Sequence, residues 1–215
     1  HVSEKPDTGR VDLQKGKVLG EVWDRKVTAR EEYGVKDVLE AHKDFLHKRS
    51  DTRASYKRAM ADNAQGVKDC GTDLIWRSRG DEEKVRAGIG LLEYAADRGN
   101  LQAGRDLVTL LLEGGVNGKK FGPHFMADYA DGKNRVQVAY ELAVNLKKGA
   151  ELRLDETFND YSKGERSADR AAVRTLNEQI RSMENDYPEL KEIKPADEAV
   201  QSIAKPGNAF NQVQI

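Results

Sequence analysis

Two stretches of helical periodicity, separated by only a few residues, constrain this chain more than any other feature. The first follows Asp81, a residue type that caps helix amino termini, and ends at Arg98-Gly99-Asn100, where a glycine can adopt the left-handed conformation of a helix end. The second ends at Gly114-Gly115. Because the linker is so short, we expect two antiparallel helices packed face to face. The apolar stripes are Val85, Ile89, Leu92 and Ala96, and then Ala103, Leu107, Leu110 and Leu111.

Part of this pattern occurs twice, with an offset of 37 residues, and a weaker copy follows at 134–154. A period of this size is typical of stacked helix pairs, because one pair alone cannot bury its apolar face. The sequence therefore predicts an all-α fold of stacked antiparallel helix pairs. The residues that we expect to form the structural repeat are Gly66, Gly71, Leu74, Ala87, Ala95, Ala96, Gly99, Ala103, Leu107, Leu111, Ala139, Ala143 and Gly149.

The remaining segments give a simple domain plan: an extended arm over 1–26, a helical domain over 27–187, and an extended tail over 188–215. Thr28 and Glu31 have capping-box spacing, which predicts a helix start, and Ser50-Asp51 marks a break. A helix from Asn134 should end at Lys147-Lys148-Gly149, and its partner should carry the apolar residues that follow. A last helix should stop before Tyr187-Pro188, since proline disfavours helix in the preceding residue. The apolar residues assigned to the partner helix are Leu152, Leu154, Phe158 and Tyr161.

Composition narrows the classes of partner. The 36 basic residues nearly cancel the 37 acidic ones, so no global field draws the chain to nucleic acid or to anionic lipid. No apolar run is long enough to span a bilayer. Cys70 is the single cysteine, so it cannot form a disulfide within the chain. We therefore expect a local patch to recognise another protein, without nucleic acid, a membrane span or a cofactor.

The best match to a known pattern lies around the first helix end. The run from Lys84-Val85-Arg86-Ala87 through Tyr94-Ala95-Ala96-Asp97-Arg98-Gly99-Asn100-Leu101-Gln102-Ala103 resembles the Sel1-like repeat, and the resemblance covers about residues 64–115. Leu74 and Leu111 stand where that repeat usually has a tyrosine, and Val108 replaces its second glycine. The resemblance implies a short right-handed α-solenoid, related to tetratricopeptide repeats, whose concave surface binds proteins.

The resemblance also implies a biological role. Some short Sel1-like proteins are periplasmic immunity partners of lipase toxins delivered by type VI secretion, and the segment Arg174 to Ile193 is similar to the carboxyl-terminal part of some of them. We therefore expect an immunity protein that neutralises a secreted toxin sterically, possessing no enzymatic activity of its own. The alternative is a Sel1-like scaffold or adaptor for an envelope or signalling assembly. Because the chain begins at His1, we expect a periplasmic protein after signal-peptide removal, or otherwise a cytoplasmic one.

An insertion at 116–133 interrupts the repeat, and long insertions on the rim of a stack commonly bind partners. Its aromatic side chains would be suitable anchors, since they bury large areas at low entropic cost. The alternative is a short extra helix that fills a gap in the core. The residues expected to contact a partner are Lys119, Phe121, His124, Phe125, Tyr129 and Asp131.

Patterns that carry catalytic chemistry are weak in this sequence. His42 and His47 are five residues apart, which places them on different sides of a helix rather than in zinc-binding register. The lysine-rich stretch at 114–120 lacks the register of a phosphate-binding loop. Cys70 falls at a core position of the repeat, which favours a buried, inert thiol over a nucleophile. The sequence predicts no catalytic, cofactor-binding or metal-binding residues.

Overall fold

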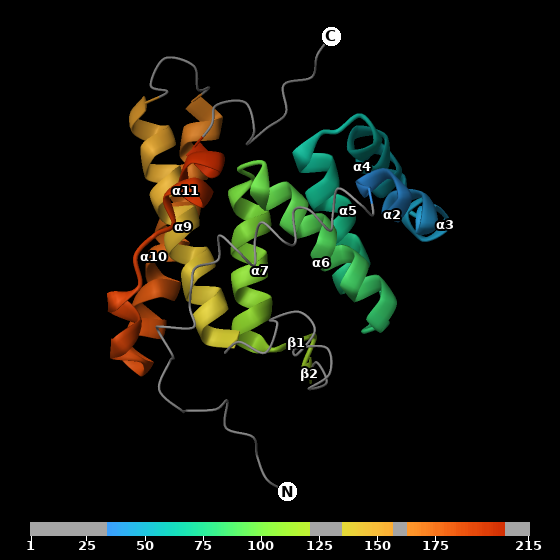
Figure 1. Ribbon diagram of the computed structural model, residues 1–215. Coiled ribbons are helices and arrows are strands. Elements are labelled where there is room, and N and C mark those ends of the chain that lie inside the picture. Colours follow the sequence, from blue (N-terminus) through green and yellow to red (C-terminus); the bar gives the residue numbers. More distant parts are fainter. Residues whose placement is uncertain (1–33, 121–134, 157–162, 205–215) are drawn as a thin grey trace, which may run out of the picture.

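The computed structural model describes residues 34–120, 135–156 and 163–204, and these residues are mostly helical, as the sequence predicts (Figure 1). The exception is a short β-hairpin in which β1 (Gly115–Val116) pairs antiparallel with β2 (Lys119–Lys120). The elements in chain order are α2 (Val35–Ala41), α3 (Lys43–Leu46), α4 (Ser50–Met60), α5 (Ala64–Trp76), α6 (Glu82–Asp97), α7 (Leu101–Glu113), β1 (Gly115–Val116), β2 (Lys119–Lys120), α9 (Arg135–Glu156), α10 (Lys163–Asp186), the 3-10 helix η1 (Pro188–Glu192) and α11 (Asp197–Ala204).

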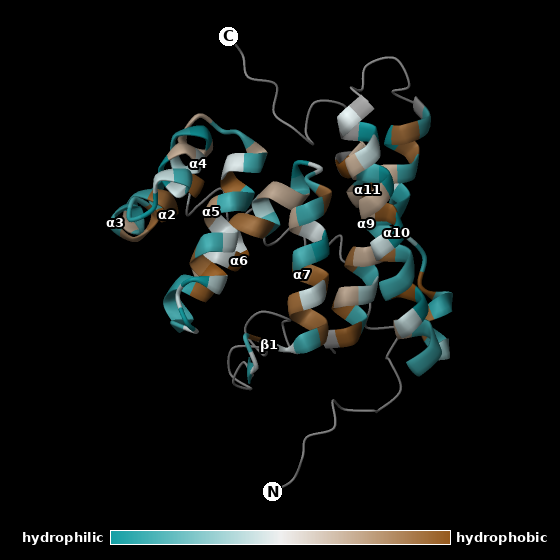
Figure 2. Cartoon of the chain, turned by 180° about the vertical axis from the view of Figure 1, so that it is seen from behind, coloured by the Kyte–Doolittle hydropathy of each residue, from teal (hydrophilic) through white to brown (hydrophobic). Residues whose placement is uncertain are grey.

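The helices lie side by side in the order of the chain. Each of α4, α5, α6, α7, α9 and α10 packs against the next, so the core continues from one helix to its successor. Figure 1 shows this progression from the blue and teal helices on one side to the orange and red ones on the other. Buried apolar residues of successive helices form one core cluster. In Figure 2 hydrophobic (brown) and hydrophilic (teal) residues alternate around the helices.

Two helix junctions share the same local chemistry. Between α4 and α5, Asp62 has a positive φ of 64° and the side chain of Asn63 accepts a hydrogen bond from the amide of Gly66 (2.9 Å). Between α6 and α7, Gly99 has a φ of 84° and Asn100 accepts from the amide of Ala103 (3.0 Å). In each case the left-handed residue ends one helix, and the asparagine then caps the next.

Burial repeats with the same offset as the sequence pattern. The buried residues of α4 are Thr52, Ser55, Tyr56 and Ala59, and the residues 37 positions later in α6 are Ile89, Leu92, Glu93 and Ala96, which are also buried. The cap of α6 agrees with the sequence as well, because the side chain of Asp81 accepts a hydrogen bond from the amide of Lys84 (3.0 Å). The four helices 50–113 therefore form two hairpins with matching inner faces.

Glycines permit a close crossing of α5 and α6. A Cβ built on Gly71 would lie 2.9 Å from the carbonyl oxygen of Gly88, and one built on Gly88 would lie 2.7 Å from the carbonyl oxygen of Gly71. The backbones of α5 and α6 thus touch directly, and a side chain at either position would separate them. In α6, Gly88 is the glycine that lets α5 approach closely. A Cβ built on Gly90, by contrast, has no atom within 4 Å.

Two predicted boundaries are wrong. Helix α9 continues from Arg135 to Glu156, so Lys147-Lys148-Gly149 does not end it, and Leu152 and Leu154 belong to α9 rather than to a partner helix. Glycine ends a helix where the chain needs a left-handed residue, but Gly149 has no positive φ and is buried against Ile203 of α11. Phe158 and Tyr161 lie outside the described residues.

The carboxyl-terminal segment also differs from the prediction. Helix α10 ends at Asp186, before Tyr187-Pro188 as expected, but the described part of the predicted extended tail contains η1 and α11. Helix α11 packs on α9 and buries four apolar residues, Ala199, Val200, Ile203 and Ala204. The segments 1–26 and 205–215, the Thr28–Glu31 capping box and the Asn134 cap lie outside the described residues.

Replacing Gly88 by alanine should destabilise the protein, and the same change at Gly90 should stabilise it. A methyl group at Gly88 would lie 2.6 Å from Cγ1 of Ile75 and would push α5 from α6. We expect G88A to lower the free energy of unfolding by about 1–3 kcal/mol and G90A to raise it by about 0.5–1 kcal/mol. Urea denaturation measures both values. Equal effects of the two substitutions would contradict the close crossing.

Candidate functional site

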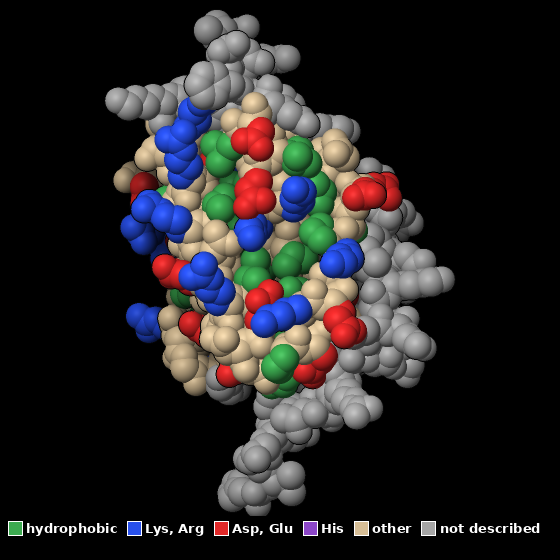
Figure 3. Space-filling model, turned by 90° about the vertical axis from the view of Figure 1, so that its left-hand side faces the viewer, with side chains coloured by type: hydrophobic (Ala, Val, Ile, Leu, Met, Phe, Trp, Pro, Cys, Tyr) green, Lys and Arg blue, Asp and Glu red, His purple; other side chains and the backbone are tan. Residues whose placement is uncertain are grey.

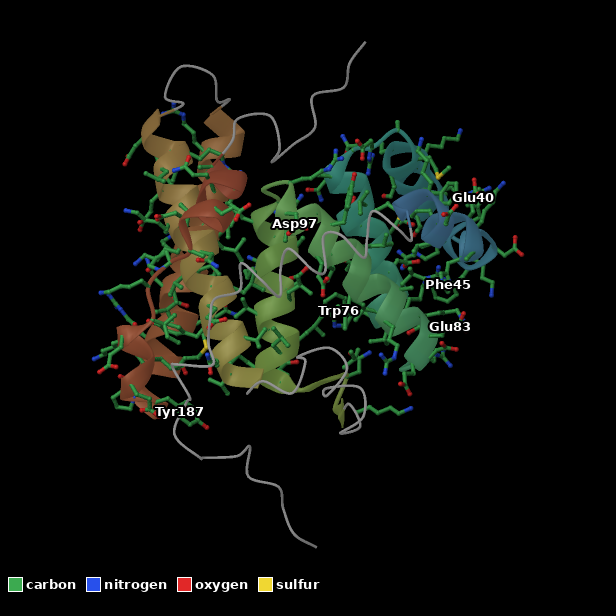
Figure 4. The ribbon with its side chains drawn as sticks, viewed as in Figure 1. Glu40, Phe45, Trp76, Glu83, Asp97 and Tyr187 are labelled. Carbon is green, nitrogen blue, oxygen red and sulfur yellow. The ribbon has the colours of Figure 1, made fainter. Side chains whose placement is uncertain are left out.

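An open groove of about 830 Å³ lies along α4 and α5. Its lining includes apolar surface and charged groups of both signs, with hydroxyl groups from both helices and the indole of Trp76 at the carboxyl end of α5 (Figure 4). Side chains that line the groove are Arg49, Asp51, Thr52, Ala54, Ser55, Arg58, Asp69, Thr72, Asp73, Trp76 and Arg77.

Arginine–aspartate pairs organise the groove. Arg77 holds Asp73 with two hydrogen bonds (Nε to Oδ1, 2.8 Å; Nη2 to Oδ2, 2.6 Å), which fixes both side chains. Arg58 donates to Asp69 Oδ2 (3.3 Å) and to the hydroxyl of Ser55 (3.1 Å). About half of the Arg58 side chain is exposed, so its charge remains available to a partner.

The acidic side chains of the groove are paired with arginines. Asp51 accepts a hydrogen bond from the amide of Thr52, which lowers the pKa of its carboxyl below the ordinary value, and Arg49 lowers it further. A general acid near neutral pH needs the opposite shift. The carboxylates of Asp51, Asp69 and Asp73 each face an arginine, so the groove carries alternating charges of both signs.

The α2–α3 segment is attached to this region through an aromatic contact. The guanidinium of Arg77 lies 4.0 Å from the ring centre of Phe45 and also donates to the Phe45 carbonyl oxygen (2.6 Å). The ammonium group of Lys84 lies 5.4 Å from the same ring. Phe45 therefore lies near the start of α6, where Glu83 is found (Figure 4), and cation–π attraction holds this corner together.

Of the partner-contacting residues predicted from the sequence, only Lys119 can be placed. It belongs to β2, is exposed, and its aliphatic chain lies against Gly80 in the α5–α6 loop. Phe121, His124, Phe125, Tyr129 and Asp131 lie outside the described residues. The first part of the predicted insertion forms the β1–β2 hairpin, with Asn117 and Gly118 at its turn. Asn-Gly is a strong hairpin signal, so the sequence contained the information for this turn.

Cys70 is fully buried, in agreement with its predicted core position. Burial raises the pKa of the Cys70 thiol to about 12, and the nearby negative charges of Asp69 and Asp73 act in the same direction. At neutral pH the side chain is therefore a protonated thiol, which is a poor nucleophile.

A second polar cluster is buried at the other side of the molecule. Arg153 of α9 has no exposed surface, and it donates hydrogen bonds from Nε to Asp169 Oδ2 of α10 (3.0 Å) and from Nη1 to the carbonyl oxygen of Gly99 (2.8 Å). A third bond runs from Nη1 to the carbonyl oxygen of Ile203 in α11 (3.2 Å). One guanidinium thus connects the α6–α7 turn with three later helices.

The outer surface around this cluster has mixed character. On the face viewed in Figure 3, lysine, arginine, aspartate and glutamate side chains surround a band of apolar ones, and neither sign of charge dominates. Within residues 34–120, 135–156 and 163–204 no group of three or more histidine, cysteine, aspartate or glutamate side chains is arranged to hold a metal ion. In the same part of the chain no helix combines the length and apolarity needed to cross a membrane.

Comparisons with known proteins give no relatives. No protein-family model matches the chain, and neither a curated protein nor a solved structure matches it significantly.

Removing one partner of the buried ion pair should be costly. Arg153→Met leaves the Asp169 carboxylate buried without its counter-ion, so we expect the free energy of unfolding to fall by about 3–5 kcal/mol. The same substitution at Arg49, whose pair with Asp51 is more than half exposed, should change it by less than about 1 kcal/mol. Denaturant titration compares the two variants. Similar losses of free energy of unfolding in both variants would show that the buried Arg153–Asp169 pair contributes no more to stability than the exposed pair.

Proposed function

We propose that this chain is a protein-binding helical-repeat protein of the Sel1-like kind, built as a short α-solenoid. The observation that carries this proposal is the pair of equivalent junctions, Asp62-Asn63 and Gly99-Asn100, with burial that repeats at the same offset. Helices that pack mainly on their neighbours in the chain are the defining feature of solenoids, which present extended surfaces to partners.

The most specific form of this proposal is an immunity protein that neutralises a secreted toxin, such as a phospholipase effector of type VI secretion. Support for it comes from the Sel1-like run between Lys84 and Ala103 and from the segment Arg174 to Ile193. The mechanism would be steric, with the stack covering the mouth of the toxin's active site. An interface of about 1,600 Å² is sufficient for tight binding of this type.

The groove of α4 and α5 is the surface that we assign to the partner. Arg58 and Asp69 lie at its wall with partly exposed charges, and their mixed signs favour one geometry of approach over others. Trp76 adds an aromatic side chain of the type that dominates binding energy at interfaces. The insertion, with Lys119 exposed beside Gly80, remains the second predicted contact region.

Coexpression with the product of the adjacent gene tests the immunity form. The two proteins should copurify as a complex. The chain should also protect cells from the adjacent gene's product when both proteins are directed to the same compartment. A toxin that neither binds nor is neutralised would contradict the immunity role. Copurification with a component of an envelope or signalling assembly instead would favour the scaffold alternative.

A matched pair of charge reversals tests the groove. Arg58→Glu changes a residue of the groove wall, whereas Lys57→Glu makes the same change in charge at the neighbouring exposed position, outside the groove lining. We expect R58E to weaken binding of the copurified partner protein at least tenfold, or about 1.4 kcal/mol. K57E should weaken this binding less than threefold. Isothermal titration calorimetry measures both. Equal affinities for the two variants would remove the groove from the interface.

A further inference from the structure

We propose that Asn145, Gly149 and Arg153 of α9 form a helix-binding surface, which α11 occupies within the chain and which a partner's helix of the same pattern can occupy instead. The three residues are spaced by four, so they lie on one face of α9. The proposal rests on the protein-binding role for the identity of the partner, but the surface itself can be tested without that partner.

The surface contacts both ends of α11 through its backbone. Asn145, which is buried, accepts a hydrogen bond from the amide of Ala196 (2.8 Å) directly before α11, and Arg153 donates to the carbonyl oxygen of Ile203 (3.2 Å) near its end. Amides at the start of a helix and carbonyls at its end lack partners within the helix. These two side chains therefore recognise helix ends in general, whatever side chains the helix carries.

Gly149 supplies the shape of the surface between those ends. A Cβ built there would lie 2.5 Å from Cγ2 of Ile203 and 3.1 Å from the carbonyl oxygen of Val200. The absence of a side chain thus opens the space in which Ile203 is buried and lets the α11 backbone approach α9. The contacts follow the same order along both helices, so α11 runs parallel to α9.

Charge and polarity identify the kind of helix that fits. The residues of α11 that face inward are Ala199, Val200, Ile203 and Ala204, whereas Asp197, Glu198 and Gln201 are exposed. The surface therefore suits an amphipathic helix with two small and two β-branched residues on its apolar face. Binding of such a helix in a groove is a common mode of protein recognition.

The connection of α11 to the rest of the chain permits exchange. Helix α11 has eight residues, too few for a stable helix in water without packing. The residues between η1 and α11 are not helical and include Pro195, so the helix is joined to the body through a short linker. Helix α9 packs against α7 and α10 as well as against α11, and α11 has a smaller contact with α6. An incoming helix can thus replace α11 while the stack remains.

Binding of the α11 segment from outside tests this surface in the full-length chain. The probe is a fluorescein-labelled peptide of residues 195–204, and the receptor is the Ile203→Asp variant, in which a charge at a buried position releases the chain's own α11. We expect the variant to bind the peptide at least tenfold more tightly than the unmodified chain does, as measured by fluorescence anisotropy. Equal binding by the two chains would overturn the proposal.

Two further variants serve as controls. Gln201→Asp adds a charge on the exposed side of α11, so the helix should stay docked and peptide binding should match that of the unmodified chain. Gly149→Val in the Ile203→Asp background fills the space at Gly149, so peptide binding should be lost. Retained binding by this double variant would show that α9 does not form the receptor. Loss of toxin binding has no bearing on these results, so the two proposals fail separately.

Hydrogen exchange on the unmodified chain covers the case in which Ile203→Asp does not fold. We expect the amides of α11 to exchange through a local opening, at least tenfold faster after correction for intrinsic rates than those of α9 between Val138 and Leu146. Exchange of α11 only together with α9, in global unfolding, would show that α11 is a fixed part of the fold and would overturn the proposal.

Discussion

The guanidinium of Arg153 is the point at which four segments of the chain meet. It donates to the Gly99 carbonyl at the α6–α7 turn, to Asp169 of α10 and to the Ile203 carbonyl of α11. A buried charge of this kind needs its counter-ion and hydrogen-bond acceptors around it, so Asp169, the Gly99 carbonyl and a helix end at the position of α11 all contribute to its stabilisation. Arg153 thus links the carboxyl-terminal helices to the α6–α7 hairpin, alongside the direct packing of α7 against α9.

Glycines determine how closely several of the helix pairs approach each other. Gly71 and Gly88 bring the backbones of α5 and α6 together, and Gly149 lets α11 approach α9. Gly104 has the same effect between α7 and α9, since a Cβ there would overlap the side chain of Leu146. Close crossings of this kind fix helix positions without large side chains. The groove of α4 and α5 lies on one side of the helix array, and α11 covers α9 on the other (Figure 1).

Local signals in the sequence predicted local structure well. The Asp81 cap, the turn at Arg98-Gly99-Asn100 and the end of α10 before Tyr187 all follow from the chemistry of single helix ends. The continuity of α9 through Gly149 and the docking of α11 depend on contacts between distant segments, which periodicity does not encode. The α4–α5 groove was missed for the same reason, because Arg58 and Asp69 look like ordinary surface charges until the two helices pack.

Hydrogen exchange of the Arg153 guanidinium tests the central constraint most directly. In ¹⁵N-edited NMR spectra, an exposed arginine Nε proton exchanges rapidly with water at neutral pH, whereas a buried, hydrogen-bonded one is protected. We expect one Nε–H signal, assigned to Arg153 by its loss in R153K, to persist at pH 8 and to show contacts to α10 and α11. An Arg153 signal that exchanges as fast as those of the exposed arginines would contradict the account.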